Sequence, residues 1–187
     1  MRLRSLFAVF GVLLAFCASG ALAAPDKAAK QAEIRKATQA TLEKFYKTQP
    51  ALKNEVRDAP GYAVFTTYGL SFLVGGSGGS GLAHERRAGK ITYMSMAQAT
   101  AGLHAGIGER EILIVFKTDK AFKEFVDKGW DVGGGAAMAG GAEGKTAGGG
   151  AGEQFLATAN YFTLTKSGIE VGGVVSGTKF WKDKDLN

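Results

Sequence analysis

The sequence predicts an α+β fold, in which N-terminal helices precede a mostly antiparallel, bent, glycine-rich β-sheet, sandwich- or barrel-like, with one inserted helix. Residues 25–57 favour helix, whereas short β-compatible runs dominate after Pro60. The connections between these runs are short, which favours antiparallel pairing. Many of the 28 glycines fall within residues 61–81 and 129–152. Glycines in strands permit bends, bulges and close backbone approach.

Helices are expected in three places. From Pro25 to about Lys47, apolar residues recur near helical spacing. Pro50 suits the first turn of a second, short helix that ends before Pro60. Thr118 can cap a third helix that Gly129 closes. The buried stripe of this third helix is expected to consist of Ala121, Phe122, Phe125 and Val126.

Strands are expected at six runs, which are residues 62–67, 70–74, 91–96, 112–116, 155–165 and 169–176. The run 112–116 is apolar throughout, so we expect it to be covered on both faces. The glycine block 129–152 could form a mobile loop or tightly packed, bent strands. Bulky residues at its flanks, such as Trp130 and Phe155, favour strands, since they give a packed domain something to hold.

The first 23 residues have the pattern of a cleaved secretory signal. Arg2 and Arg4 precede an apolar run, and Ala21-Leu22-Ala23 suits cleavage. The apolar run is shorter than the roughly 20 residues that a permanent span requires. Cys17 could instead carry a lipid, but the bulky Phe16 before it disfavours a lipoprotein.

Three segments therefore follow from the sequence. Residues 1–23 are expected to be removed, residues 24–49 to form a basic amphipathic helix, and residues 50–187 to form the main domain. The exported protein would be periplasmic or secreted. Since Cys17 is the only cysteine, the exported chain would have neither disulfides nor thiolate chemistry.

The first helix allows two interpretations. Its lysines and arginines surround an apolar stripe, so it could lie on an anionic membrane with the stripe dipping into lipid. The stripe is narrow and rich in alanine, which favours an ordinary surface helix packed on the domain. The stripe consists of Ile34, Ala37, Leu42 and Phe45.

Two nucleotide-binding patterns nearly fit. Gly76-x-Gly78-x-x-Gly81 has dinucleotide spacing, but a poor helix opening follows it and the position about 20 residues on is Ala101. Gly144-Lys145-Thr146 resembles the end of a phosphate loop, but the first glycine of that motif is replaced by Ala139. Neither pattern supports a nucleotide site.

Catalytic and metal-binding constellations are not evident in the sequence. We interpret His84 as an exposed loop residue and His104 as a strand side chain, and neither has a second ligand at metal spacing. Ser77 lies in a G-x-S-x-G pattern, but no helix-like segment follows. We therefore expect no enzyme activity, metal, cofactor or nucleic-acid partner.

Four segments closely resemble the SYLF lipid-binding family. They are Asp58-Ala-Pro-Gly-Tyr-Ala-Val-Phe65, residues 72–82, residues 101–108 with the strand at 112–116, and residues 161–177. The resemblance runs in unbroken order over about residues 50–187. It departs at Gly89-Lys-Ile-Thr-Tyr-Met-Ser95, where the family commonly has a tryptophan and a proline. Eukaryotic relatives bind phosphoinositide membranes, partly through a basic amphipathic helix, and some bind actin; bacterial relatives are mostly exported.

The resemblance implies a noncatalytic protein that binds lipid at the bacterial envelope. Anionic phospholipid is the expected partner, bound through the first helix and a basic loop. The candidate lipid-binding residues are Lys27, Lys30, Arg35, Lys36, Arg86, Arg87 and Lys90. The alternative is a structural or protein-interaction module of the periplasm, with an envelope protein as partner.

Overall fold

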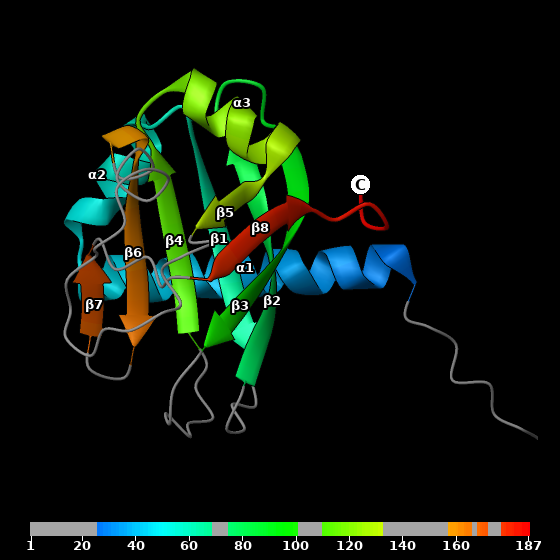
Figure 1. Cartoon of the computed structure of the whole chain (residues 1–187). Helices are drawn as coiled ribbons and strands as arrows, with labels where there is room; N and C mark the ends of the chain where they lie inside the picture. Colours follow the sequence, from blue (N-terminus) through cyan, green and yellow to red (C-terminus); the bar gives the residue numbers. More distant parts are fainter. Residues whose placement is uncertain (1–25, 69–74, 101–109, 133–156, 166–167, 172–176) are drawn as a thin grey trace, which may run out of the picture.

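The computed structural model describes residues 26–68, 75–100, 110–132, 157–165, 168–171 and 177–187. Within these ranges it contains helices and one large sheet, which confirms the predicted α+β class (Figure 1). The helices are α1 (Lys27–Thr48), α2 (Ala51–Asp58) and α3 (Asp119–Lys128). The strands are β1 (Gly61–Tyr68), β2 (Gly75–Glu85), β3 (Ile91–Thr100), β4 (Arg110–Phe116), β5 (Trp130–Val132), β6 (Ala159–Thr165), β7 (Gly168–Val171) and β8 (Thr178–Lys182).

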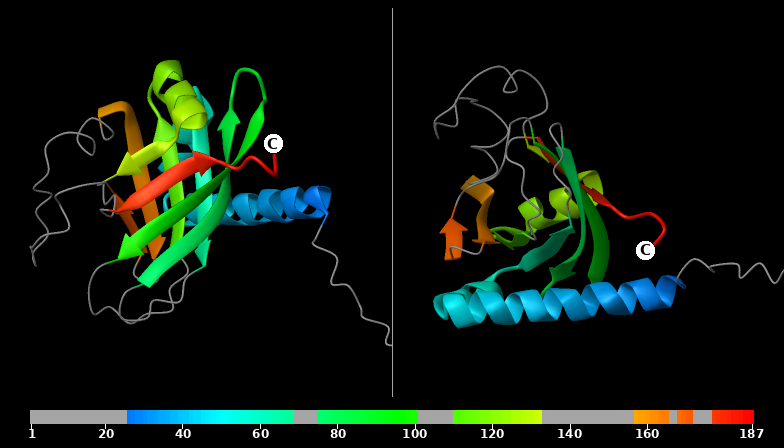
Figure 2. Two further views of the ribbon diagram at one scale, coloured as in Figure 1. Left: turned by 45° about the vertical axis from the view of Figure 1, so that its right-hand side comes forward. Right: turned by 90° about the horizontal axis from the view of Figure 1, so that it is seen from below.

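The strands form one eight-stranded sheet in the order β5-β8-β3-β2-β1-β4-β6-β7. Every described pairing is antiparallel, as the short connections predict. The sheet curls around α3, while α1 lies along its outer face (Figure 2). We call the side that faces α3 the inner face and the side that faces α1 the outer face.

Both faces of the central strands are buried, because successive side chains point to opposite sides of a sheet. On the inner face, Phe65 and Ile114 pack in a cluster with α3. On the outer face, Val64 and Leu113 pack with Phe45 of α1 and with α2. The prediction that residues 112–116 are covered on both faces is therefore confirmed.

Helix α3 follows the sequence prediction at both ends. The Thr118 side chain accepts a hydrogen bond from the Ala121 amide, and Gly129 ends the helix with a φ of 71°. The four predicted apolar residues are buried. Among them, Phe125 is fully buried, and its ring centroid lies 5.1 Å from that of Phe116 and 4.7 Å from that of Trp130. This aromatic cluster fixes α3 to the inner face.

The glycines of β2 differ in the space around them according to the face of the sheet on which a side chain would lie. A Cβ atom added to Gly81 would lie 2.1 Å from the carbonyl oxygen of Val64, and one added to Gly79 would lie 2.8 Å from that of Thr66. A Cβ atom added to Gly78 would meet nothing within 4 Å. Gly79 and Gly81 therefore permit the close approach of β1 to β2, as expected of glycines in strands.

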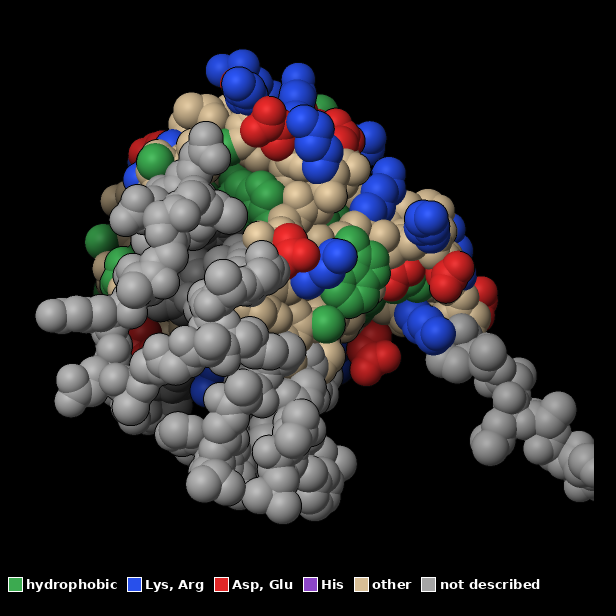
Figure 3. Space-filling model, in the orientation of Figure 1, with side chains coloured by type: hydrophobic (Ala, Val, Ile, Leu, Met, Phe, Trp, Pro, Cys, Tyr) green, Lys and Arg blue, Asp and Glu red, His purple; other side chains and the backbone are tan. Residues whose placement is uncertain are grey.

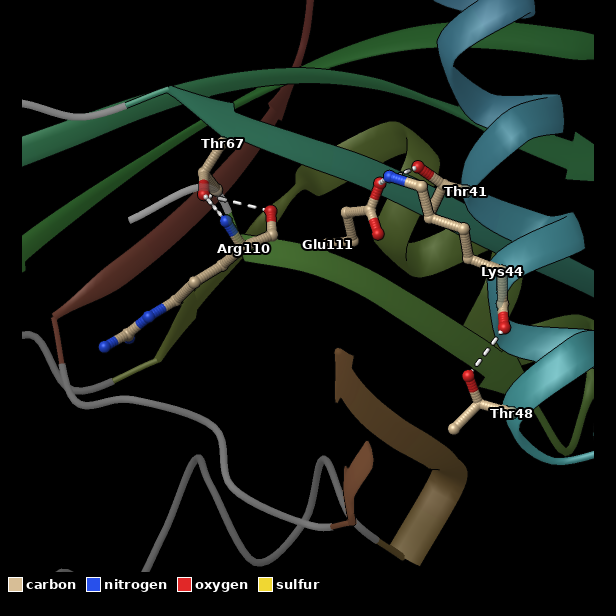
Figure 4. Close-up of polar contacts among 6 residues, drawn as sticks. All are labelled: Thr41, Lys44, Thr48, Thr67, Arg110 and Glu111. Carbon is tan, nitrogen blue, oxygen red and sulfur yellow. Dashed lines mark hydrogen bonds and ion pairs between the residues drawn. The ribbon is translucent and has the colours of Figure 1, made fainter. Parts of the chain in front are cut away.

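The C-terminal half of α1 is tied to the sheet by a partly buried acid (Figure 4). The Glu111 carboxylate of β4 accepts hydrogen bonds from Thr41 Oγ1 at 3.0 Å and from Lys44 Nζ at 2.6 Å. Beside it, Thr67 Oγ1 both donates to the Arg110 carbonyl and accepts from the Arg110 amide, at 3.0 Å each. The Glu111 contacts fix α1 to β4, and the Thr67 contacts join β4 to β1.

Several predictions of elements need correction or lie outside the described residues. The chain forms one strand that the sequence did not predict, β8, and β2 occupies Gly75–Glu85, beyond the predicted run 70–74. Strand β5 lies at the start of the block 129–152, where strands were the favoured interpretation. Strand β6 begins at Ala159, later than predicted. The predicted signal at 1–23, the predicted strand at 70–74 and the glycine block beyond Val132 lie outside the described ranges.

Candidate functional site

A pocket of about 550 Å³ lies at the end of the sheet that carries the start of α3. Three connections meet there, namely those from α2 to β1, from β2 to β3 and from β4 to α3. Figure 3 shows lysine and arginine side chains gathered at the α3 end of the molecule, with acidic groups among them. The pocket is lined by Arg57, Asp58, Ala59, Pro60, Arg86, Arg87, Lys117, Thr118 and Asp119.

Four cations and two carboxylates line this cationic pocket. Arg57 donates to the two oxygens of Asp58 at 2.8 and 3.1 Å, and this hydrogen bonding lowers the pKa of Asp58. Arg87 Nη1 lies 3.3 Å from the Asp119 carboxylate. Both pairs are exposed to solvent, so water and salt screen them and each adds little to stability.

Arg86 lines the pocket from the turn between β2 and β3. Its backbone amide donates to the Pro60 carbonyl at 2.9 Å, which fixes the turn between β2 and β3. Within the part of the chain that the structure describes, none of the ion pairs involves its guanidinium. Burial raises the pKa of Tyr62, and the Arg86 charge acts in the opposite direction. Arg86 therefore lines the pocket outside the ion pairs of the described residues, although its charge also acts on the Asp58 carboxylate.

The interpretation of His84 as an exposed loop residue was wrong. His84 lies in β2 opposite Tyr62, and the two rings make an edge contact with centroids 5.3 Å apart. Its Nδ1 atom is buried without a hydrogen-bond partner among the described residues. Burial, and then the charge of Arg86, lower the pKa of His84. The sequence was misleading because the charged residues from Glu85 onward suggested a loop, whereas the strand ends only at Glu85.

The seven candidate lipid-binding residues are all exposed, but the structure divides them. Arg86 and Arg87 line the cationic pocket, and Lys90 lies in the same turn. The four candidates on α1 do not line it. Two of those four, Lys27 and Arg35, are engaged within the protein: Lys27 Nζ donates to the Asn187 carbonyl at 2.8 Å, and Arg35 Nε donates to the Tyr93 hydroxyl at 2.5 Å.

The stripe of α1 faces the sheet. Ile34 and Phe45 of the predicted stripe are buried, in agreement with the interpretation of α1 as a surface helix packed on the domain. Ala37 and Leu42 are only partly buried, and Thr38 and Thr41 are buried instead. While α1 is docked, the same stripe cannot enter a bilayer. None of the described helices combines the length and apolar character that a membrane crossing requires.

The structure also tests the near-matches to catalytic and nucleotide motifs. Gly75–Gly81 lies within β2, so neither the dinucleotide pattern nor the G-x-S-x-G pattern around Ser77 occupies a strand-turn-helix. His104 and Gly144-Lys145-Thr146 lie outside the described residues. In the described ranges, no three or more His, Cys, Asp or Glu side chains are arranged to hold a metal.

The sequence interpretation missed two cations of the pocket, Arg57 and Lys117. Arg57 is in the last turn of a helix and Lys117 directly follows an apolar strand. Both lie at element ends, which is a weak signal by itself. Only the antiparallel register, which places the start of β1 beside the ends of β2 and β4, brings them together with Arg86.

Comparison with known proteins supports the family resemblance. Residues 97–187 match the family model Ysc84, described as Las17-binding protein actin regulator. The chain is also 34% identical over 170 residues to a protein of Aeromonas veronii named Beta cell expansion factor A. This similarity covers 86% of the chain but 60% of the relative, so the chain spans less than two thirds of that protein's length. Residues 97–187 therefore match the SYLF (Ysc84) family, in agreement with the resemblance that the motifs predict.

Proposed function

We propose that this chain is a noncatalytic protein of the bacterial envelope that binds the headgroups of anionic phospholipids. The cationic pocket is the observation that carries this proposal, because four cations from the end of α2, the β2–β3 turn and the β4–α3 connection surround it and only two carboxylates oppose them. Export to the periplasm or beyond, after cleavage of the signal, is part of the same proposal.

The chemistry of the pocket suits a phosphate group. Guanidinium groups present paired N–H donors that match two phosphate oxygens, and such charge-assisted hydrogen bonds are stronger than neutral ones. Because the pairs Arg57–Asp58 and Arg87–Asp119 are solvent-exposed, a headgroup phosphate can replace the carboxylates at little cost. A pocket of about 550 Å³ has room for a headgroup.

The remaining candidates would add attraction without specificity. An exposed lysine or arginine near an anionic membrane surface contributes about 1 kcal/mol, and this contribution falls with increasing salt. Lys90, and Lys30 and Lys36 of α1, are exposed and therefore suited to this role. Binding would combine one phosphate site with a diffuse electrostatic contribution.

Vesicle co-sedimentation tests the proposal. The wild-type chain should bind vesicles with anionic phospholipid at low salt, and should bind purely zwitterionic vesicles far less. Arg86→Glu should weaken binding about 30-fold, since a reversal removes one favourable contact and adds a repulsive one, each about 1 kcal/mol.

Lys53→Glu is a matched control. It makes the same charge change on the exposed side of α2, outside the pocket. Equal losses for Arg86→Glu and Lys53→Glu would show diffuse attraction without a phosphate site. Failure of the wild type to bind anionic vesicles would overturn the proposal and leave the protein-interaction alternative.

A further inference from the structure

The N-terminal half of α1 is held by a segment far away in the sequence, residues 183–187. Lys27 Nζ donates to the Asn187 carbonyl at 2.8 Å, and Gln31 Nε2 donates to the Leu186 carbonyl at 2.7 Å. Leu186 is buried in a small apolar cluster with Ile34. These contacts form a clamp over the first turns of the helix.

The clamp is itself anchored to β3. The Asn187 side chain accepts from the Tyr93 amide at 3.0 Å and donates to the Tyr93 carbonyl at 2.8 Å. Asp183 accepts from Ser95 Oγ at 2.8 Å and from the Asp185 and Leu186 amides at 3.0 and 3.1 Å. The segment is thus fixed by side-chain hydrogen bonds, each of which is modest on its own.

The helix beneath the clamp has little stabilisation of its own. Asp26 makes no side-chain capping bond, and the first turn contains no acid. Lysine near a helix N-terminus is unfavourable because that end carries partial positive charge. A cleft of about 310 Å³ also separates this half of α1 from the sheet, with Ile34, Thr38, Thr66 and Ser80 among the residues that line it.

Docking also engages the charges that a membrane would attract. Lys27 is bonded to Asn187, and Arg35 is bonded to the Tyr93 hydroxyl with its guanidinium carbon 5.6 Å from the ring centroid. The stripe residue Ile34 is 8% exposed. Docking on the sheet and insertion into an anionic bilayer therefore use the same side chains and exclude each other.

We propose that residues 27–38 form a second, latent membrane-contact surface, and that the clamp 183–187 keeps it folded against the sheet. Opening of the clamp releases the first turns of α1, while Phe45 and the Glu111 contacts keep its C-terminal half in place. The released segment presents Ile34 and its cations to an anionic bilayer. The membrane step rests on the proposed function, whereas the opening itself does not.

Amide hydrogen exchange on the full chain tests the opening without lipid. The double substitution Leu186→Ala and Asn187→Ala should accelerate exchange in residues 30–38 about tenfold or more, and leave Val64 and Leu113 unchanged. Gln39→Ala is the control, because it is a neutral change on the exposed side of α1 away from the clamp. Unchanged exchange in 30–38, or faster exchange throughout the sheet, would overturn the clamp.

Anionic vesicles then test the membrane step. The clamp variant should bind about three- to tenfold more tightly than the wild type at low salt, and Lys30→Glu, Arg35→Glu and Lys36→Glu together should remove that gain. Exchange in residues 30–38 can accelerate in the clamp variant without tighter vesicle binding. If wild-type binding still depends on Arg86, that result contradicts the membrane role of residues 27–38 but leaves the proposed function intact. If exchange in residues 30–38 accelerates but neither the wild type nor the clamp variant binds vesicles, both the membrane step and the proposed function are contradicted.

Discussion

The two faces of the sheet are covered in different ways. On the inner face, a helix of 10 residues buries four apolar side chains and has a capping residue at each end. On the outer face, a helix of 22 residues buries two apolar side chains and two threonines, with no side-chain cap at its start. The longer helix is therefore not the more firmly packed one. Helix α3 is held by apolar side chains buried in the core, whereas α1 is held in large part by polar contacts.

The largest single effect should appear on truncation of buried side chains. Phe125→Ala should lower the free energy of unfolding by about 4 kcal/mol, because this fully buried ring contacts several other aromatic rings. Ile34→Ala should cost about 2 kcal/mol, since its site adjoins a cleft and already lacks some packing. Denaturant unfolding measures both values, and equal losses would contradict the comparison.

A second pair of substitutions compares the two faces within β2. Gly81→Ala should cost about 3 kcal/mol, because the added Cβ would lie 2.1 Å from the backbone of β1. Gly78→Ala, three residues earlier, meets nothing within 4 Å and should stabilise the protein by about 0.5 kcal/mol. Thermal and denaturant unfolding would reveal both effects. Tolerance of alanine at position 81 would show that β1 and β2 can separate.

The helix starts give a smaller contrast. Thr118→Ala should lower the free energy of unfolding by about 1 kcal/mol, since it removes the cap on the Ala121 amide. Asp26→Ala should cost no more than about 0.3 kcal/mol, because Asp26 makes no capping bond and acts only on the helix dipole. A cost at Asp26 as large as that at Thr118 would mean that the start of α1 is better fixed than its contacts suggest.

The smallest expected effect is a dependence on pH at the outer face. The pKa of His84 in the folded protein lies below its ordinary value of 6.5, owing to burial and the Arg86 charge. As the pH falls below about 6.5, the unfolded chain takes up the proton first, so stability falls until the pH reaches the lowered pKa of the folded state. Above about pH 6.5, His84 is neutral in both the folded and the unfolded state, so the free energy of unfolding no longer depends on its titration.

His84→Gln should flatten this part of the stability profile, measured as denaturation midpoints between pH 7.5 and 5. The other of the two histidines, His104, remains in the variant and serves as an internal reference. An unchanged slope in the variant would assign the dependence to a group other than His84.

The sequence was informative where local chemistry decides the structure. Thr118 and Gly129 mark the ends of α3 because a cap and a glycine act on neighbouring backbone. The apolar run 112–116 indicated a strand buried on both faces, as found. In contrast, β8 was not predicted, since Thr178–Lys182 alternates small, charged and aromatic residues and pairs with a strand distant in the sequence.

The candidate site was only partly predictable for the same reason. Arg86 and Arg87 stand out as adjacent charges in a turn, but Arg57 and Lys117 join them only through strand register. His84 was misassigned because its neighbours on the chain are charged, whereas its neighbour in space is Tyr62. The assignment of residues 24–49 and 50–187 to separate segments stays a prediction, as do export and the headgroup that binds.

The clamp on α1 has a consequence for the order of folding. Its hydrogen bonds join residues 160 and 155 positions apart, so they connect the first and last segments of the described chain. Contacts of such separation are costly to close early and form after the strands have paired. Interactions that are absent from the folding transition state affect the unfolding rate alone. Asn187→Ala should therefore leave the refolding rate unchanged and accelerate unfolding. The clamp would then determine the lifetime of the docked helix.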